Sequence, residues 1–336
     1  MKRKLVVGVV ASAAFLYLAV RGIDTDAFAA VFRRTNVWWL IPAVFFTMLG
    51  HYTRAWRWKF MMAPVKTVTI GPLWSATAIA FMVNNLFPAR IGEFVRAYVI
   101  GKHEGVSKSA AFATIVYERV VDVFMLIVLL CYCLLTTEGP DWLARSALAL
   151  IVFNVVLLAT LYAMIRRRAT FNALLARALR PLPPRVAERA GHAADAFVEG
   201  LGVVTDARAL VPIVVLSVGV WGSAVLGVHF CVLAMDVAVP AAASLFLIAV
   251  ISLGSMIPSA PAFVGTLQYA CVVGLAVYGV DKSTALAFST VYHATQFFPI
   301  TAAGGYYAWR SSLRLAEVSG RSTLNESGSG PAELAK

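Results

Sequence analysis

The chain has 336 residues, of which 60% are hydrophobic and only 14% are charged. Soluble domains carry about one-quarter charged residues, so this composition excludes an ordinary soluble protein and predicts an all-α polytopic membrane protein. The net charge of +12 would suggest a nucleic-acid partner for a soluble protein. Here the basic residues gather at the ends of apolar segments, where they orient a membrane protein and meet anionic lipid, so no nucleic-acid partner is expected.

The apolar segments, taken in chain order, predict about eight transmembrane helices, since each needs roughly 20 residues to cross a bilayer. The first segment follows a basic start and resembles a secretory signal. It is longer than the apolar core of such a signal, and we interpret it as a retained helix. The predicted spans are residues 5–20, 37–53, 70–87, 109–135, 144–165, 209–235, 240–257 and 283–309.

Two further apolar pieces, residues 91–100 and 263–280, are too short or too interrupted to cross a bilayer. The first would form roughly 15 Å of helix, about half of the apolar thickness. A membrane tolerates such backbone only where protein or water covers it. Both pieces are therefore predicted to be re-entrant hairpins within a single transmembrane domain, residues 1–314. The polar residues 315–336 are predicted to be a disordered tail.

Lysine and arginine predict the orientation of the chain in a bacterial cytoplasmic (inner) membrane, because they are enriched in cytoplasmic loops. Arg33 and Arg34 fall on the outer side and do not fit this pattern. The segments predicted to face the cytoplasm are both termini, a loop with Arg54, Arg57, Lys59 and Lys66, and residues 166–168.

Residues 166–208 lie between two predicted spans and are rich in arginine. Two pieces with apolar residues at every third or fourth position flank a Pro-Leu-Pro-Pro break. This pattern predicts a cytoplasmic amphipathic connector that lies on the membrane surface, with a docking site for a partner protein as the alternative.

A nine-residue stretch occurs twice: GVSKSAAFA at 105–113 and GVDKSTALA at 279–287 agree at six positions. In both places a proline-interrupted apolar run comes before and a long apolar run follows. The two units, about 70–135 and 240–309, would place this stretch on opposite sides of the membrane. That predicts an inverted-repeat architecture of the kind found in secondary transporters. The alternative is that both stretches are simply good helix starts.

Charged residues interrupt the first unit where a membrane tolerates them least. Counted from Ser107, Glu118 lies roughly 16 Å and Asp122 about 22 Å along a helix, near the middle of a core of about 30 Å. An unpaired charge there costs about 2.5–3.5 kcal/mol. Glu118 and Asp122 are four residues apart and project from one helix face, with Arg119 about a quarter turn away. They are therefore predicted to be paired and to face protein or water.

The partners expected for these carboxylates lie on the first hairpin. Arg90, Glu93 and Arg96 are spaced by three residues, and the simplest arrangement places the two arginines opposite the two acids. In the second unit His293 and Gln296 align with charged positions of the first, so that unit would be polar but uncharged. The candidate binding residues are Arg90, Glu93, Arg96, Glu118, Arg119, Asp122, His293 and Gln296.

This constellation has two compatible interpretations. It locks the hairpin by ion pairs, or it forms a polar slot in which Arg90 and Arg96 hold an anionic head group, with the carboxylates balancing them when the slot is empty. A metal site of Glu118, Asp122 and His293 is a minor alternative. The sequence contains no phosphate-binding loop, zinc-protease motif or serine-hydrolase motif. Neither an enzyme nor a cofactor is therefore predicted.

The segments PARIGEFVRAYVIGKHEGVSKSAAFATIVYERVVDV, IPSAPAFVGTLQ and GVDKSTALAFSTVYH resemble the transmembrane region of lysylphosphatidylglycerol synthases, a flippase-like family, over roughly residues 5–310. The resemblance implies a domain that translocates lipid, with the charges of the first unit as its motif positions. Only 22 residues follow residue 314, too few for the aminoacyl-transferase domain of two-domain members, so synthase activity is not expected. Stand-alone members are associated with hopanoid lipids or polyprenyl-linked glycosylation.

The predicted function is transport of a polar-headed lipid between leaflets, by alternating access at a charged midplane site. The lipid would be of anionic, aminoacylated, polyprenyl or hopanoid type, and it is the expected partner. One alternative is a non-catalytic accessory subunit that scaffolds a lipid-modifying enzyme or glycosyltransferase. A third hypothesis is an intramembrane enzyme that uses Glu118 and Asp122. Whether the protein forms a homo-oligomer is left open.

Overall fold

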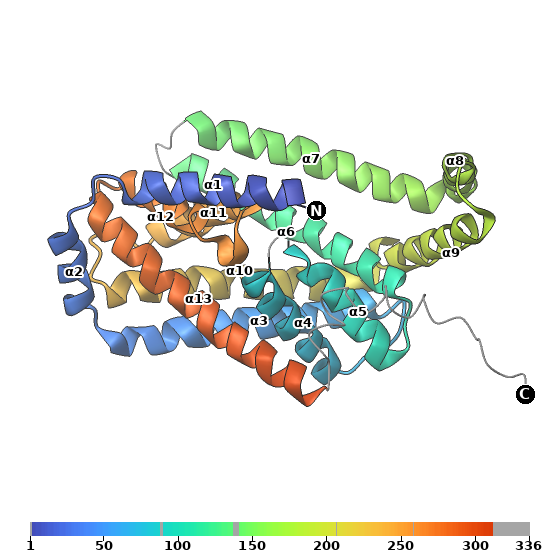
Figure 1. The fold of residues 1–336 in the computed structure, drawn as a ribbon, viewed down its shortest axis with the longest axis horizontal. Coiled ribbons are helices and arrows are strands. Elements are labelled where there is room, and N and C mark those ends of the chain that lie inside the picture. Colours follow the sequence, from blue (N-terminus) through green and yellow to red (C-terminus); the bar gives the residue numbers. More distant parts are fainter. Residues whose placement is uncertain (1, 88–89, 137–140, 206, 258, 312–336) are drawn as a thin grey trace, which may run out of the picture.

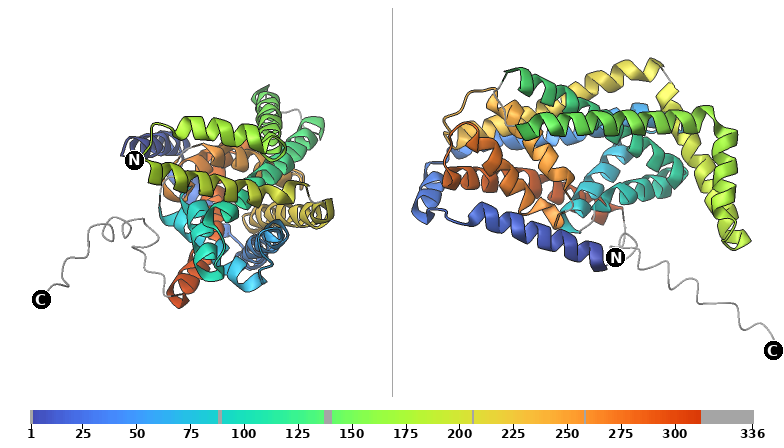
Figure 2. Two further views of the ribbon diagram at one scale, coloured as in Figure 1. Left: turned by 90° about the vertical axis from the view of Figure 1, so that its right-hand side faces the viewer. Right: turned by 90° about the horizontal axis from the view of Figure 1, so that it is seen from above.

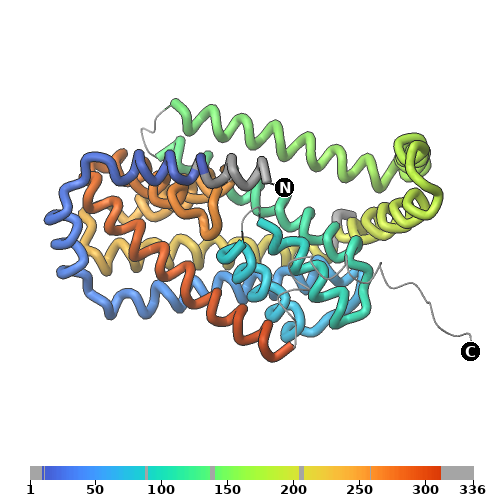
Figure 3. Tube along the Cα trace, in the orientation of Figure 1, coloured from blue at the N-terminus to red at the C-terminus, as the bar shows by residue number. Residues whose placement is uncertain are grey.

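The computed structural model describes residues 2–87, 90–136, 141–205, 207–257 and 259–311. Within these residues every regular element is a helix, which confirms the predicted all-α class. The predicted tail, 315–336, lies outside them. Most of the long helices run lengthwise through the molecule, and the last helix, Lys282–Arg310, crosses them obliquely (Figure 1; Figure 3). The elements are α1 (Lys2–Val20), α2 (Thr25–Arg34), η1 (Val37–Trp39), α3 (Leu40–Met62), α4 (Ile70–Leu86), α5 (Gly92–Glu104), α6 (Lys108–Thr136), α7 (Asp141–Arg166), α8 (Arg168–Leu179), α9 (Pro184–Gly200), η3 (Leu201–Thr205), α10 (Ala207–Ala234), α11 (Ala243–Met256), η4 (Pro261–Phe263), α12 (Thr266–Ala276) and α13 (Lys282–Arg310).

Three helices of the described chain are long and apolar enough to cross a membrane: Lys108–Thr136, Asp141–Arg166 and Arg208–Ala234. The surface of α7 is apolar as well, with Leu148 63% and Val155 59% exposed. Large aliphatic side chains at such a surface suit lipid tails and not water. The fold is therefore that of a membrane protein, and the number of about eight spans stays a prediction.

The predicted hairpin at 91–100 corresponds to α5, a helix of 13 residues that packs against α4. The chain turns between them, and Arg90 adopts a left-handed φ of 51° there. The amide of Gly92 donates a hydrogen bond to Oδ1 of Asn84 (2.8 Å). A Cβ atom on Gly92 would overlap the carbonyl oxygen of Ala80, so the tight return of the chain requires glycine. Its re-entrant placement in a membrane stays a prediction.

The second hairpin joins α11 to α12, which has only 11 residues, through η4. Ala262, Phe263 and Gly265 all have positive φ angles, of 56°, 58° and 89°. Helix α1 packs against α12 and covers the turn, where Ser12 accepts a hydrogen bond from the amide of Ala260 (2.6 Å). Because α1 supports this turn from outside, the first helix is an integral part of the bundle.

The two units contain matching helices. Helices α6 and α13 each have 29 residues and begin at Lys108 and Lys282, after Gly105 and Gly279 with φ of 66° and 73°. Helix α4 packs against α13, and α11 packs against α6. The start of α6 is bonded to α9 and the start of α13 to the beginning of α2, at opposite ends of the molecule (Figure 1). The two long helices therefore run in opposite directions.

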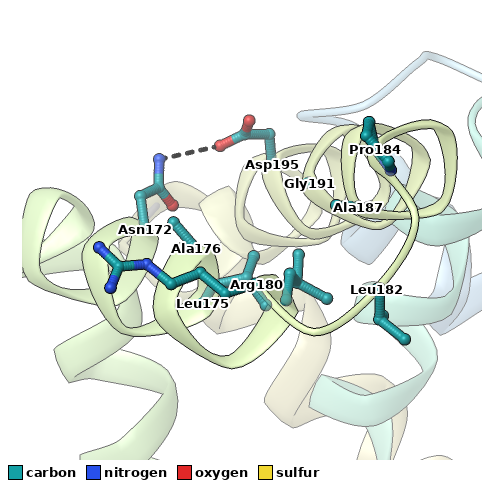
Figure 4. Close-up of a pocket in the computed structure, with 10 residues that line it drawn as sticks. Asn172, Leu175, Ala176, Arg180, Leu182, Pro184, Ala187, Gly191 and Asp195 are labelled. Atoms are coloured by element: carbon teal, nitrogen blue, oxygen red, sulfur yellow. Dashed lines mark hydrogen bonds between the residues drawn. The ribbon is translucent and has the colours of Figure 1, made fainter.

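The connector predicted at 166–208 forms α8, α9 and η3. Helix α8 leaves the end of α7 and lies across the direction of the long helices (Figure 2), and α9 returns to pack on α6. A groove of about 430 Å³ separates α8 from α9, and at one point Asn172 donates to Asp195 across it (3.2 Å; Figure 4). The two helical pieces around the proline break are thus present, and their position on the cytoplasmic side stays a prediction.

The contact between α4 and α13 depends on Gly304, where a Cβ atom would overlap the carbonyl oxygen of Ala78. Gly304→Ala is expected to lower the free energy of unfolding by about 1–3 kcal/mol, as overpacking does. The measurement is thermal unfolding of the purified protein in detergent. Gly222→Ala on α10 is the matched control, because no atom lies within 4 Å of its added methyl group. Equal unfolding midpoints for the two variants would contradict the packing of α4 on α13.

Candidate functional site

Helix α3 carries two arginines that the sequence analysis placed in a cytoplasmic loop. That prediction was wrong, because α3 continues without interruption from Leu40 to Met62. No glycine or proline occurs in residues 51–63, so nothing breaks the helix before Pro64. Arg54 and Arg57 are three residues apart and share one face of α3. Both point toward the carboxylates of α6.

Arginines of α3 and of α6 itself hold the carboxylates of Glu118 and Asp122 on α6. The Nη1 atom of Arg54 lies 2.9 Å from Oε1 of Glu118 and 2.6 Å from Oδ2 of Asp122, so it bridges the two acids. The Nη2 atom of Arg57 lies 2.7 Å from Oδ1 of Asp122. Arg119 bridges them from α6 itself, at 2.7 Å from Glu118 and 3.1 Å from Asp122.

Arg96 of α5 reaches the same carboxylates from the first hairpin. Its Nη1 atom lies 2.8 Å from Oε2 of Glu118, so this predicted pairing is confirmed. The guanidinium group also stacks over the ring of Trp58, 3.8 Å from its centroid, a cation–π contact. The indole of Trp58 donates in turn to Thr114 (2.8 Å). The guanidinium group of Arg96 is thus held by an ion pair with Glu118 and by stacking on Trp58.

These six side chains form a network that is largely buried, except that the Arg119 side chain is 42% exposed. Arg57 and Glu118 are 0% exposed and Arg96 is 3% exposed. Electrostatic interactions are strong where water is excluded. Four guanidinium groups meet two carboxylates, which leaves two positive charges in excess. The arginine network, as we name it, consists of Arg54, Arg57, Arg96, Glu118, Arg119 and Asp122.

A cavity of about 450 Å³ lies beside the arginine network, between α3, α6, α7, α10, α11 and α13. Its charged lining comes from Arg54, Arg90, Arg119 and Asp122. Trp221 also lines it, and the buried Nε1 atom of this indole has no hydrogen-bond partner among the described residues. The cavity is amphipathic, because much of its wall is formed by Phe46, Val123, Leu126, Phe153, Leu157 and Ile248.

Arg90 differs from the expected arrangement, since among the described ion pairs it binds neither carboxylate of α6. Its guanidinium group donates to the carbonyl oxygen of Ser255 at the end of α11 and lies over the ring of Phe263, 4.7 Å from the centroid. Arg90 therefore joins the turn of the first hairpin to the turn of the second. Glu93 accepts a long hydrogen bond from Asn84 (3.5 Å) and supports the first turn.

The two candidate residues of the second unit, Gln296 and His293, lie in different surroundings. Gln296 lines the cavity, and its Nε2 atom donates to Thr47 of α3 (2.7 Å). His293 is instead bonded to Gln268 of the second hairpin (3.0 Å). No three His, Cys, Asp or Glu side chains in the described parts of the chain could hold a metal ion together, so the minor alternative of a metal site at His293 lacks its ligands.

Glu118→Gln is expected to destabilise the protein by about 3–5 kcal/mol, because it leaves buried guanidinium groups without their counter-charge. Glu93→Gln makes the same chemical change outside the network and should cost far less. Thermal unfolding in detergent compares the two variants. A loss of stability in Glu93→Gln as large as that in Glu118→Gln would contradict the special role of the arginine network.

Comparison with known proteins agrees with these motifs. The family model described as the lysylphosphatidylglycerol synthase TM region matches residues 5–304. A UPF0104 membrane protein of Methanothermobacter thermautotrophicus is 27% identical over 320 residues, which cover 89% of this chain and 92% of the relative. A UPF0104 membrane protein of Methanocaldococcus jannaschii is 26% identical over 222 residues, 66% of this chain and 91% of the relative. The chain belongs to the family of the lysylphosphatidylglycerol synthase transmembrane region.

Proposed function

We propose that this protein moves a lipid with an anionic head group between the leaflets of a bacterial cytoplasmic membrane. The head group would bind in the cavity beside the arginine network, while the acyl chains remain in the bilayer. Both termini and the connector α8–α9 would face the cytoplasm. In this account the protein performs no chemical step and acts as a transporter without a cofactor.

The observation that carries the proposal is the amphipathic cavity in the apolar bundle. Arg54, Arg90 and Arg119 line it together with aromatic and aliphatic side chains. A lipid has the same division into a charged and an apolar part. Guanidinium groups bind phosphate and carboxylate oxygens through charge-assisted hydrogen bonds. A cavity with this lining therefore suits a lipid head group with the first part of its chains better than a soluble metabolite.

Alternating access requires two bodies that move against each other, and we propose that the two matching units are these bodies, arranged as an inverted repeat. The equal lengths and opposite directions of α6 and α13 support this proposal, as does the reciprocal packing of α4 on α13 and α11 on α6. Inverted repeats place a binding site near the midplane, where broken helices meet. Arg90 would act at this junction, because it bonds one broken segment to the other.

The second candidate function is a scaffold for a lipid-modifying enzyme or glycosyltransferase. The groove between α8 and α9 favours it, since Leu182 lines the groove beside Arg180 and is 42% exposed. An intramembrane enzyme is less well supported. Glu118 and Asp122 are engaged by four arginines, so their oxygens are already occupied by guanidinium groups.

Purified protein in liposomes, with the leaflet exposure of fluorescent phosphatidylglycerol followed over time, tests transport. Exchange is expected to be faster than in empty vesicles. Ala224 lines the cavity, and the larger side chain of Ala224→Phe would occupy part of it. A steric cost of about 1–3 kcal/mol to the passing lipid should lower the exchange rate by about tenfold. Ala159→Phe on the exposed surface of α7 is the matched control and should exchange normally.

Two results would count against transport. The first is exchange no faster than in empty vesicles for any anionic lipid tested. The second is equal exchange by the Ala224→Phe and Ala159→Phe variants, which would place the route outside the cavity. Co-purification of a stoichiometric enzyme that is lost with Leu182→Glu, in the groove between α8 and α9, would favour the scaffold.

A further inference from the structure

We infer that the head group bound at the arginine network is a phosphomonoester dianion, and this inference rests on the proposed function. The proposal above requires only a negative charge. Three features specify how many negative charges the ligand carries and in which chemical group. They are the net charge of the network, its burial, and the unpaired hydrogen-bond donors beside the cavity.

The first step is the excess charge of the network. Each carboxylate is shared by several guanidinium groups, and no further acid pairs with these arginines among the described residues. Arg90 donates to Ser255 and Glu93 accepts from Asn84, so these two side chains stay outside the ion pairs of the network, and their opposite unit charges add nothing to the count. The excess therefore remains two positive charges.

The second step is that the protein does not screen this excess. Arg57 and Arg96 are almost fully buried and Arg54 has a side chain only 15% exposed. Buried charges without counter-charges oppose folding by several kcal/mol. A ligand with two negative charges neutralises the network completely, whereas a ligand with one negative charge leaves half of the excess uncompensated.

The third step is the set of free donors at the cavity. The Nε atom of Arg119 and the Nε1 atom of Trp221 are buried and have no hydrogen-bond partner in the described parts of the chain. Both residues line the cavity, as does Arg54. Each buried donor without an acceptor costs about 1–3 kcal/mol. A ligand group with several acceptor oxygens would remove this cost and is therefore favoured at the site.

A phosphomonoester meets both requirements. It carries about 1.5 to 2 negative charges at neutral pH and presents three acceptor oxygens. A phosphodiester such as phosphatidylglycerol carries one negative charge. A lysyl ester of that lipid adds ammonium groups, which would be repelled by a network already in positive excess. The predicted order of affinity is therefore phosphomonoester, then phosphodiester, then aminoacylated lipid.

The test measures binding in detergent from the shift of the unfolding midpoint with increasing ligand. The probes are dioctanoyl phosphatidic acid, dioctanoyl phosphatidylglycerol and inorganic phosphate at pH 7.5. Phosphatidic acid is expected to bind at least about tenfold more tightly than phosphatidylglycerol, because one additional charge-assisted hydrogen bond is sufficient for that difference. Equal or tighter binding of phosphatidylglycerol to the unmodified protein would overturn the inference, and this comparison needs no variant.

Arg119 offers the sharpest variant, because its side chain is the most exposed of the four network arginines at 42%. Arg119→Gln removes one of the two excess charges, so the preference for phosphatidic acid should fall to less than about threefold. Arg119→Lys keeps the charge and should keep most of the preference. Arg145→Gln, on the exposed surface of α7, is the control for a change in net charge alone. An undiminished preference in Arg119→Gln would also overturn the inference.

The remaining outcomes separate this inference from the transport proposal. Inorganic phosphate binding as tightly as phosphatidic acid would support a dianion site but overturn a lipid as its source. Selective binding of phosphatidic acid without exchange in liposomes would support the site and count against transport. Equal exchange of both lipids without selective binding would support transport and overturn the phosphomonoester.

Discussion

The structure depends on the compensation of buried charges in an apolar bundle. Glu118 is fully buried and Asp122 nearly so, and arginines from α3, α5 and α6 converge on them. Arg57 extends the contacts to α10 through a hydrogen bond to Ser217 (2.9 Å). Four helices are thereby joined at one point by directional bonds, in a protein whose other contacts are mostly non-directional apolar packing. Any rearrangement of these helices must exchange or preserve those bonds.

The two carboxylates do not neutralise all of the buried arginine charge, and this excess links the stability of the fold to the proposed function. A network with equal numbers of acids and bases would only lock the helices. Here positive charge remains in excess beside a cavity with apolar walls, so an anionic head group would complete the electrostatic balance that the protein lacks. Arg90 bonds the two broken segments at the same cavity. Binding of an anion near Arg90 would compete for its guanidinium group and so loosen the junction between the two units.

Much of this arrangement could be predicted from the sequence. The helical class followed from composition, the presence of two short helices after interrupted runs from their lengths, and the pairing of Arg96 with Glu118 from the cost of central charges. Arg54 and Arg57 were missed, because basic residues after an apolar run usually mark a loop. The absence of a helix breaker up to Pro64 was the available signal. The contact of Arg90 with Ser255 could not have been foreseen, since it depends on how two distant turns meet in space.

A structure of the protein in nanodiscs that contain phosphatidic acid and phosphatidylglycerol would test the central claim most directly. The account predicts a lipid head group within hydrogen-bonding distance of Arg54 and Arg119, inside the cavity, with its chains leaving between helices. A cavity that holds only water, with every ordered lipid on the outer surface of the bundle, would contradict it.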